Sequence, residues 1–168
     1  MKKILVIMAM AFGLSAGVQA QDDSKMAVGV NLNAGVGDSY TNFGAGAKFQ
    51  YKFHKHWRGE ASFNYFFKKD FLSMWDVNID AHYLIPIGSS GLTVYPLAGF
   101  TVRGTKVSFD EYGFSASVSD TGFGVNYGAG IEYPVSNHFK LNFEAKGQTA
   151  GCGMGTRGIF SIGCAYCF

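Results

Sequence analysis

The chain has 168 residues, and its 14 basic and 12 acidic side chains give a formal net charge of +2. Lys2 and Lys3 account for that excess, so the rest of the sequence is balanced and shows no basic surplus for binding nucleic acid. With 23 glycines, 3 prolines and 16% aromatic residues, the composition disfavours long helices and favours strands. Beyond residue 20, no apolar run reaches the roughly 18 residues typical of a transmembrane helix.

Residues 1–20 have the organisation of a secretory signal peptide. Two lysines precede an apolar run over 4–14, and small residues precede the expected cleavage point after Ala20. The run is too short to span a bilayer, which takes about 20 residues. We therefore expect residues 1–20 to be removed and residues 21–168 to form one domain.

Apolar and polar residues alternate in a series of segments, the pattern of strands with one apolar face. The segments are 26–33, 43–53, 57–67, 74–85, 92–103, 121–133, 138–148 and 156–168. Strands of roughly ten residues cross a bilayer when tilted. The connections alternate between short and long, as in an up-and-down transmembrane barrel with both termini in the periplasm. The last segment must then pair with the first, because a lipid-exposed sheet has no free edge.

The apolar face of these strands is predicted to point outward. A soluble lipocalin-like barrel also alternates, with its apolar face inside. The interior of an eight-stranded barrel, however, is only wide enough to be filled by side chains. Trp, Phe and Tyr occur on nearly every strand and would overfill it, whereas the opposite, polar and glycine-rich face would fit. The sequence therefore predicts an all-β fold, an eight-stranded antiparallel up-and-down transmembrane β-barrel.

The inward face then carries charges of both signs, and buried charges persist only when they are paired. The predicted interior polar network comprises Lys48, Arg58, Glu60, Asp76, Asp80, His82, Glu132, Lys140, Glu144 and Lys146. Lys52, Arg103 and Arg157 lie on the same face. The short turn after Pro134 is expected to place Glu132 opposite Lys140.

The longest connection, residues 104–120, alternates in the opposite sense. Its lumen-side positions are apolar and include Val107, Phe109, Phe114 and Val118. We interpret it as a hairpin that turns within residues 110–113 and stands above the membrane. Its apolar strip is expected to pack over Phe66, Leu72 and Met74. A capped barrel mouth, a shallow ligand pocket and a partner-binding edge all fit this hairpin.

Motifs that might carry chemistry have simpler structural explanations. Cys164 and Cys167 have metal or redox spacing, but residues three apart on a strand point to opposite faces, about 10 Å apart and beyond disulfide reach. His82 would need a nucleophile such as Ser62 or Ser161 from another strand, and interior polar networks are ordinary in small barrels. We therefore predict no catalytic, cofactor-binding or metal site.

The last strand ends in a recognisable pattern. Ser161, Gly163, Tyr166 and the final Phe168 resemble the carboxy-terminal signal of bacterial outer-membrane barrels. Together with the signal peptide, the strands and the protruding hairpin, this pattern resembles the OmpX-like small outer-membrane barrels, grouped with proteins often labelled porin family or outer-membrane β-barrel domain. The resemblance implies a bacterial outer-membrane location, insertion by the β-barrel assembly machinery and a non-enzymatic surface role.

The leading functional hypothesis is a monomeric, lipid-embedded barrel with a plugged polar interior and a structural or adhesion-like role. An extracellular partner would bind at the 104–120 hairpin. A lipid A-modifying enzyme and a small-solute pore are the alternatives. The four histidines lie towards the periplasm, which disfavours an enzyme of the outer leaflet. Porins use about 16 strands, which disfavours a pore.

Overall fold

The computed structural model describes residues 24–37, 41–69, 72–88, 90–111, 114–151 and 153–168. The expected signal peptide lies outside these residues. The strands in the described ranges are β1 (Met26–Val36), β2 (Thr41–His54), β3 (Trp57–Lys69), β4 (Leu72–Tyr83), β5 (Ile85–Ile87), β6 (Leu92–Glu111), β7 (Phe114–Pro134), β8 (Phe139–Ala150) and β9 (Gly155–Cys167). Among the described residues, no helix has the length and hydrophobicity needed to cross a membrane.

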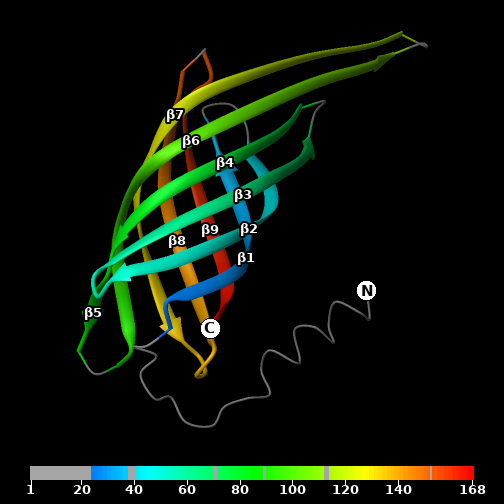
Figure 1. Cartoon of the computed structure of the whole chain (residues 1–168). Coiled ribbons are helices and arrows are strands. Elements are labelled where there is room, and N and C mark those ends of the chain that lie inside the picture. The colour runs from blue at the N-terminus through cyan, green and yellow to red at the C-terminus, as the bar shows by residue number, and fades with distance from the viewer. Residues whose placement is uncertain (1–23, 38–40, 70–71, 89, 112–113, 152) are drawn as a thin grey trace, which may run out of the picture.

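The strands form one closed antiparallel sheet (Figure 1). Its order is β4-β3-β2-β1-β9-β8-β7-β6-β5, and a β4–β6 pairing closes the circle. The first and last long strands pair from Ala27↔Cys167 to Val36↔Gly158, as predicted. β5 follows β4 after a one-residue break at Leu84 and pairs with β6, so the two together complete the fourth long strand. The predicted eight-stranded up-and-down barrel is confirmed.

The two faces of the wall differ sharply in polarity, and they have the predicted orientation. On β4 the side chain of Ile79 is 66% exposed, whereas its neighbour Asp80 is 1% exposed. On β1 the same contrast holds for Leu32, 64% exposed, and Asn33, 3% exposed. A water-soluble fold has the reverse arrangement, because apolar burial drives its folding. The apolar exterior is therefore a surface for lipid.

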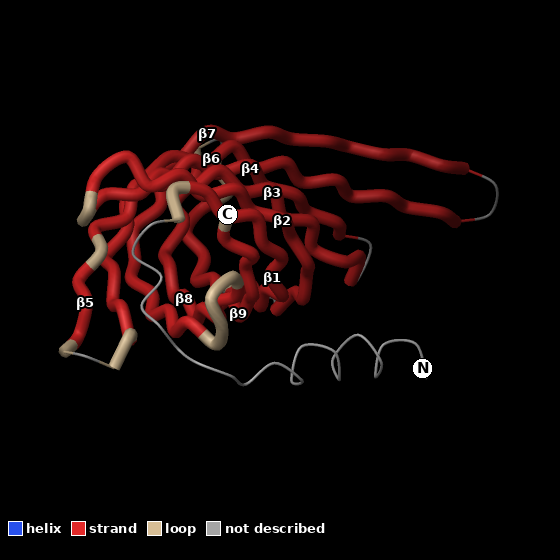
Figure 2. Tube along the Cα trace, turned by 60° about the horizontal axis from the view of Figure 1, so that its bottom comes forward, coloured by secondary structure: helices blue, strands red, loops and turns tan. Residues whose placement is uncertain are grey.

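The β6–β7 hairpin extends well beyond the other strands (Figure 2). In the described residues β6 pairs with β4 only as far as Val107, and β7 pairs with β8 only from Gly124. Past these points β6 and β7 continue to pair with each other up to Glu111↔Phe114. The predicted hairpin is thus confirmed for its two paired strands, and residues 112–113 of the expected turn lie outside the described residues.

The strands are longer than the alternation alone indicated. β1 continues to Val36 rather than ending at Asn33, and residues 104–111 and 114–120 belong to β6 and β7. The expected apolar strip of the hairpin, Val107, Phe109, Phe114 and Val118, and its contact Leu72 have side chains outside the described residues. Its other two expected contacts, Phe66 and Met74, are buried at the outer end of the lumen together with Ile159.

Candidate functional site

The barrel interior holds a network of charged and polar side chains. The predicted members Lys48, Arg58, Glu60, Asp76, Asp80, His82, Glu144 and Lys146 are buried, and Glu132 and Lys140 are half-buried. They form three groups along the barrel axis: a central group, an outer group and a periplasmic group. Each group contains residues of both signs.

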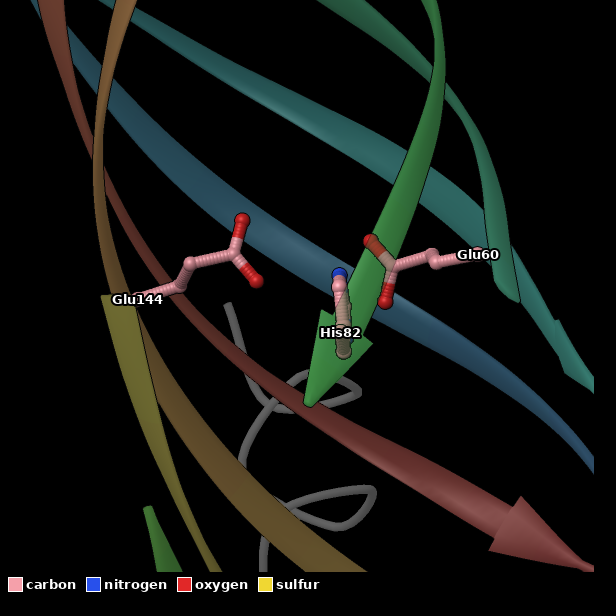
Figure 3. A group of neighbouring side chains, drawn as sticks. All are labelled: Glu60, His82 and Glu144. Carbon is pink, nitrogen blue, oxygen red and sulfur yellow. The ribbon is translucent and has the colours of Figure 1, made fainter. Parts of the chain in front are cut away.

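The central group is organised around Glu60 on β3, His82 on β4 and Glu144 on β8 (Figure 3). One ligand-type atom from each of these three side chains lies within 4.8 Å of the others. Alternation on each strand turns these side chains inward, and the curvature of the closed sheet brings them together across the lumen.

Both carboxylates of the central group have cationic and neutral partners. Lys48 Nζ lies 3.7 Å from Glu60 Oε2, and Gln50 donates a 2.6 Å hydrogen bond to the same oxygen. Lys146 Nζ lies 3.5 Å from Glu144 Oε1 and 3.2 Å from Asp80 Oδ2. Interior charge is thus paired, as buried charge must be.

The tautomer of His82 follows from its contact with Arg58. Arg58 Nε and Nη2 lie 3.3 and 3.0 Å from His82 Nδ1. A guanidinium can only donate, so Nδ1 accepts and the proton of the neutral ring sits on Nε2. The ring also stacks on Tyr95 with a centroid distance of 4.7 Å. His82 is therefore held rigidly, with an N–H and not a lone pair directed away from Arg58.

This arrangement does not fit a divalent cation. A metal takes the lone pair of a neutral imidazole nitrogen, and the Nε2 proton of His82 occupies that position. Lys48 and Lys146 are already paired with the neighbouring carboxylates, and their positive charge opposes the binding of a further cation. The chemistry of the group is that of a structural polar network.

The serines considered as nucleophiles are bonded elsewhere. Ser62 Oγ accepts a 3.2 Å hydrogen bond from Asn78, and Ser161 Oγ donates a 2.7 Å hydrogen bond to Asn33. The structure therefore does not bring them together with His82 into a nucleophile and base.

The outer group centres on a fully buried ion pair. Arg157 Nη2 lies 2.5 Å from Asp76 Oδ2, and both side chains are 0% exposed. Arg157 Nε donates to Gln148 at 2.7 Å, and Asp76 accepts from Asn64 at 2.7 Å. The Arg157 guanidinium also lies 4.5 Å from the ring centroid of Phe66. The pair joins β4 to β9 across the lumen.

The periplasmic group has two cations on one carboxylate oxygen. Arg58 Nη1 and Lys140 Nζ lie 2.6 and 3.2 Å from Glu132 Oε2. The expectation that Glu132 lies opposite Lys140 is wrong in register, because Glu132 pairs with Asn142 and Lys140 with Pro134. The contact forms across the diagonal, which long side chains can span.

Tyr95 belongs to the network although sequence reasoning did not single it out. It is fully buried, donates a 3.2 Å hydrogen bond to Glu144 and stacks on His82. Gly130 makes room for it, since a Cβ there would lie 2.5 Å from the Tyr95 hydroxyl. The alternation along the strand places Tyr95 on the inward face, but alternation does not identify its partners across the lumen.

The residues of the expected carboxy-terminal signal divide between the two faces of β9. Ser161 is buried in the lumen, whereas the exposed rings of Tyr166 and Phe168 stack at 6.3 Å outside. Gly163 has Val30 O 2.6 Å from the position of a Cβ, so only glycine fits there without a shift. Their role in assembly stays a prediction.

A closed antiparallel barrel that is apolar outside and charged inside defines an integral outer-membrane β-barrel protein. The sequence matches the model of the outer membrane protein beta-barrel domain family over residues 6–168, and the chain belongs to this family. It is thus a protein of the bacterial outer membrane. A search of curated proteins found no match.

Solved structures show the same fold. The N-terminal β-barrel domain of Pseudomonas aeruginosa OprF is 17% identical, with 87% of this chain and 100% of that one aligned and a TM-score of 0.63. Ail, the attachment invasion locus protein of Yersinia pestis, is 20% identical, with 86% and 97% aligned and a TM-score of 0.61. Neisserial surface protein A is 16% identical, with 85% and 96% aligned and a TM-score of 0.63.

Proposed function

We propose that this protein is a surface-interaction barrel with an adhesion-like role, whose β6–β7 hairpin contacts an extracellular partner. The supporting observation is the length of the hairpin, which keeps its pairing up to Glu111↔Phe114 after the neighbouring strands have ended. A paired hairpin presents a stiff surface away from the membrane, and ordering it costs little entropy on binding.

The similarity to Ail supports the same proposed role. That protein is named for attachment and invasion, and it has been crystallised with the heparin analogue sucrose octasulfate. We extend to this chain only the general role of contact with a surface outside the cell.

Replacing residues 106–119 with a two-residue Asn-Gly turn tests the hairpin. The barrel should still fold, because Thr105↔Asp120 continues the ladder into a tight turn. Bacteria displaying the shortened protein should lose adhesion to wells coated with extracellular matrix proteins. A matched variant with residues 151–154 shortened in the same way should adhere normally. Full adhesion after removal of the hairpin would overturn the proposal.

We further propose that the interior is plugged and conducts no solute. Support comes from ion pairs that cross the lumen, Arg157 to Asp76 and Lys146 to Asp80. Purified monomer in a planar bilayer should give no stepwise conductance under conditions in which a 16-stranded porin does. Steady unitary conductance from the monomer would contradict the plugged interior.

We propose no enzymatic role. An enzyme acting on lipid A needs its reactive groups at the outer leaflet. Exposed His54, His56 and His138 lie at the opposite end, beside the short turns, and His82 lies inside the lumen.

A further inference from the structure

The periplasmic end of the barrel contains a cavity that the proposed surface role does not use. It has a volume of about 290 Å³. It lies between the start of β1, the turn after β2 and the end of β7. Its charged lining residues are Arg58, Glu132, Lys140 and the half-buried Lys52 on the lumen side and Lys25 and Lys55 at the rim. A cavity of this size suits a small ligand.

The charges in this cavity do not balance. Arg58 and Lys140 share a single carboxylate oxygen of Glu132, so among the described residues of the floor two positive charges face one negative charge. Lys25 and Lys55 add two more at the rim, where both are exposed. With the half-buried Lys52, five cations therefore face one carboxylate among the described residues that line the cavity.

The rest of the interior does not supply the missing negative charge. Deeper in the lumen, the buried carboxylates are Glu60, Asp76, Asp80 and Glu144, and the buried cations are Lys48, Arg103, Lys146 and Arg157. The two sets are equal in number, although two lysines face three carboxylates in the central group and two arginines lie with Asp76 in the outer group. The positive surplus is thus confined to the periplasmic mouth, and incompletely compensated buried charge favours a bound anion.

The donor types indicate which anion. Arg58 already directs Nη1 to Glu132 and Nε and Nη2 to His82, so its planar fork is occupied. The remaining cationic donors are lysine ammonium groups, which bind phosphate as point charges rather than as a bidentate fork. Leu84 and Pro134 add apolar wall beside them, which suits the organic part of a ligand.

We propose that this cavity binds a phosphate ester at the periplasmic face, with Lys140 at its floor and Lys25 and Lys55 at its rim. The phosphate comes either from a small soluble ester or from the headgroup of an inner-leaflet phospholipid. Both present a phosphate anion with a short organic group. Because this face is remote from the β6–β7 hairpin, the inference is independent of adhesion.

The test uses full-length protein in a phosphate-free maltoside detergent, titrated with glycerol 3-phosphate by calorimetry. Lys140→Gln should weaken binding about tenfold, the loss of one charge-assisted hydrogen bond. Folding should survive, because Arg58 and Glu132 then form a one-to-one pair. Lys106→Gln removes the same charge from an exposed site at the outer end and should leave binding unchanged.

A second arm separates the two sources. Nanodiscs containing phosphatidylglycerol are examined by phosphorus NMR for a headgroup population that is immobilised by the protein and lost in Lys140→Gln. Saturable binding of glycerol 3-phosphate supports a soluble ester, and an immobilised headgroup without such binding supports a lipid. The proposal is overturned if neither is observed, or if Lys140→Gln matches the unchanged protein in both.

Discussion

Asp76→Asn is expected to lower the free energy of unfolding by about 3–5 kcal/mol, the cost of breaking a buried ion pair by removing one partner. The substitution keeps the shape of the side chain, so it creates no cavity. It leaves the guanidinium of Arg157 buried without the carboxylate that lies 2.5 Å away. Equilibrium urea unfolding in phospholipid vesicles, followed by fluorescence of Trp57 and Trp75, measures the change.

Two further variants isolate the ion pair. Arg157→Met together with Asp76→Asn should recover much of the loss, because no unmatched charge remains, and the double-mutant cycle gives the coupling energy. Asp120→Asn removes the same charge from an exposed position and should change stability by less than about 0.5 kcal/mol. If Asp76→Asn and Asp120→Asn unfold at the same urea concentration, Asp76 is not part of a buried pair.

The wall of the barrel could be predicted from sequence because strands have a two-residue period. Ile79 and Asp80 are neighbours in the chain, and their opposite polarity alone assigns them to opposite faces. The ends of strands were harder to predict. Backbone pairing of β6 with β7 continues through residues 104–120, where the alternation in the sequence changes sense and no longer marks a lipid-facing strand.

The sequence predicts which residues belong to the interior network, but it does not predict which of them contact one another. Parity places Arg58 and Glu132 inside, yet they are 74 residues apart in the sequence and meet only because the closed sheet brings β3 and β7 together across the lumen. Contacts of this kind depend on strand tilt and stagger, which local alternation does not encode. The same limit explains the register error for Lys140, which reaches Glu132 along a diagonal.

The surplus of positive charge at the periplasmic mouth depends on which side chains lie together in the closed barrel. By composition the chain carries almost no net charge, and by parity the inward charges nearly cancel. The deeper carboxylates and cations are equal in number, and the excess positive charge falls on Lys140, Lys52 and the rim lysines. A balanced total can therefore conceal a localised site.

Ile162→Lys is expected to destabilise the protein in vesicles by about 2–4 kcal/mol, the cost of a lysine on the lipid face near the bilayer midplane. Ile162 is 60% exposed and lies midway along β9, between Leu32 of β1 and Phe143 of β8. Urea unfolding in vesicles and the heat-modifiability shift on gels report the loss.

Phe53→Lys provides the matched control, because Phe53 is 59% exposed on the same face but lies beside the turn at the end of β2. Lysine there can reach the interface, so the cost should fall to about 0–1 kcal/mol. This gradient along the strand distinguishes a lipid-facing band from an apolar surface that is merely exposed. Equal losses for the two variants would mean that the hydrocarbon region does not cover the middle of β9.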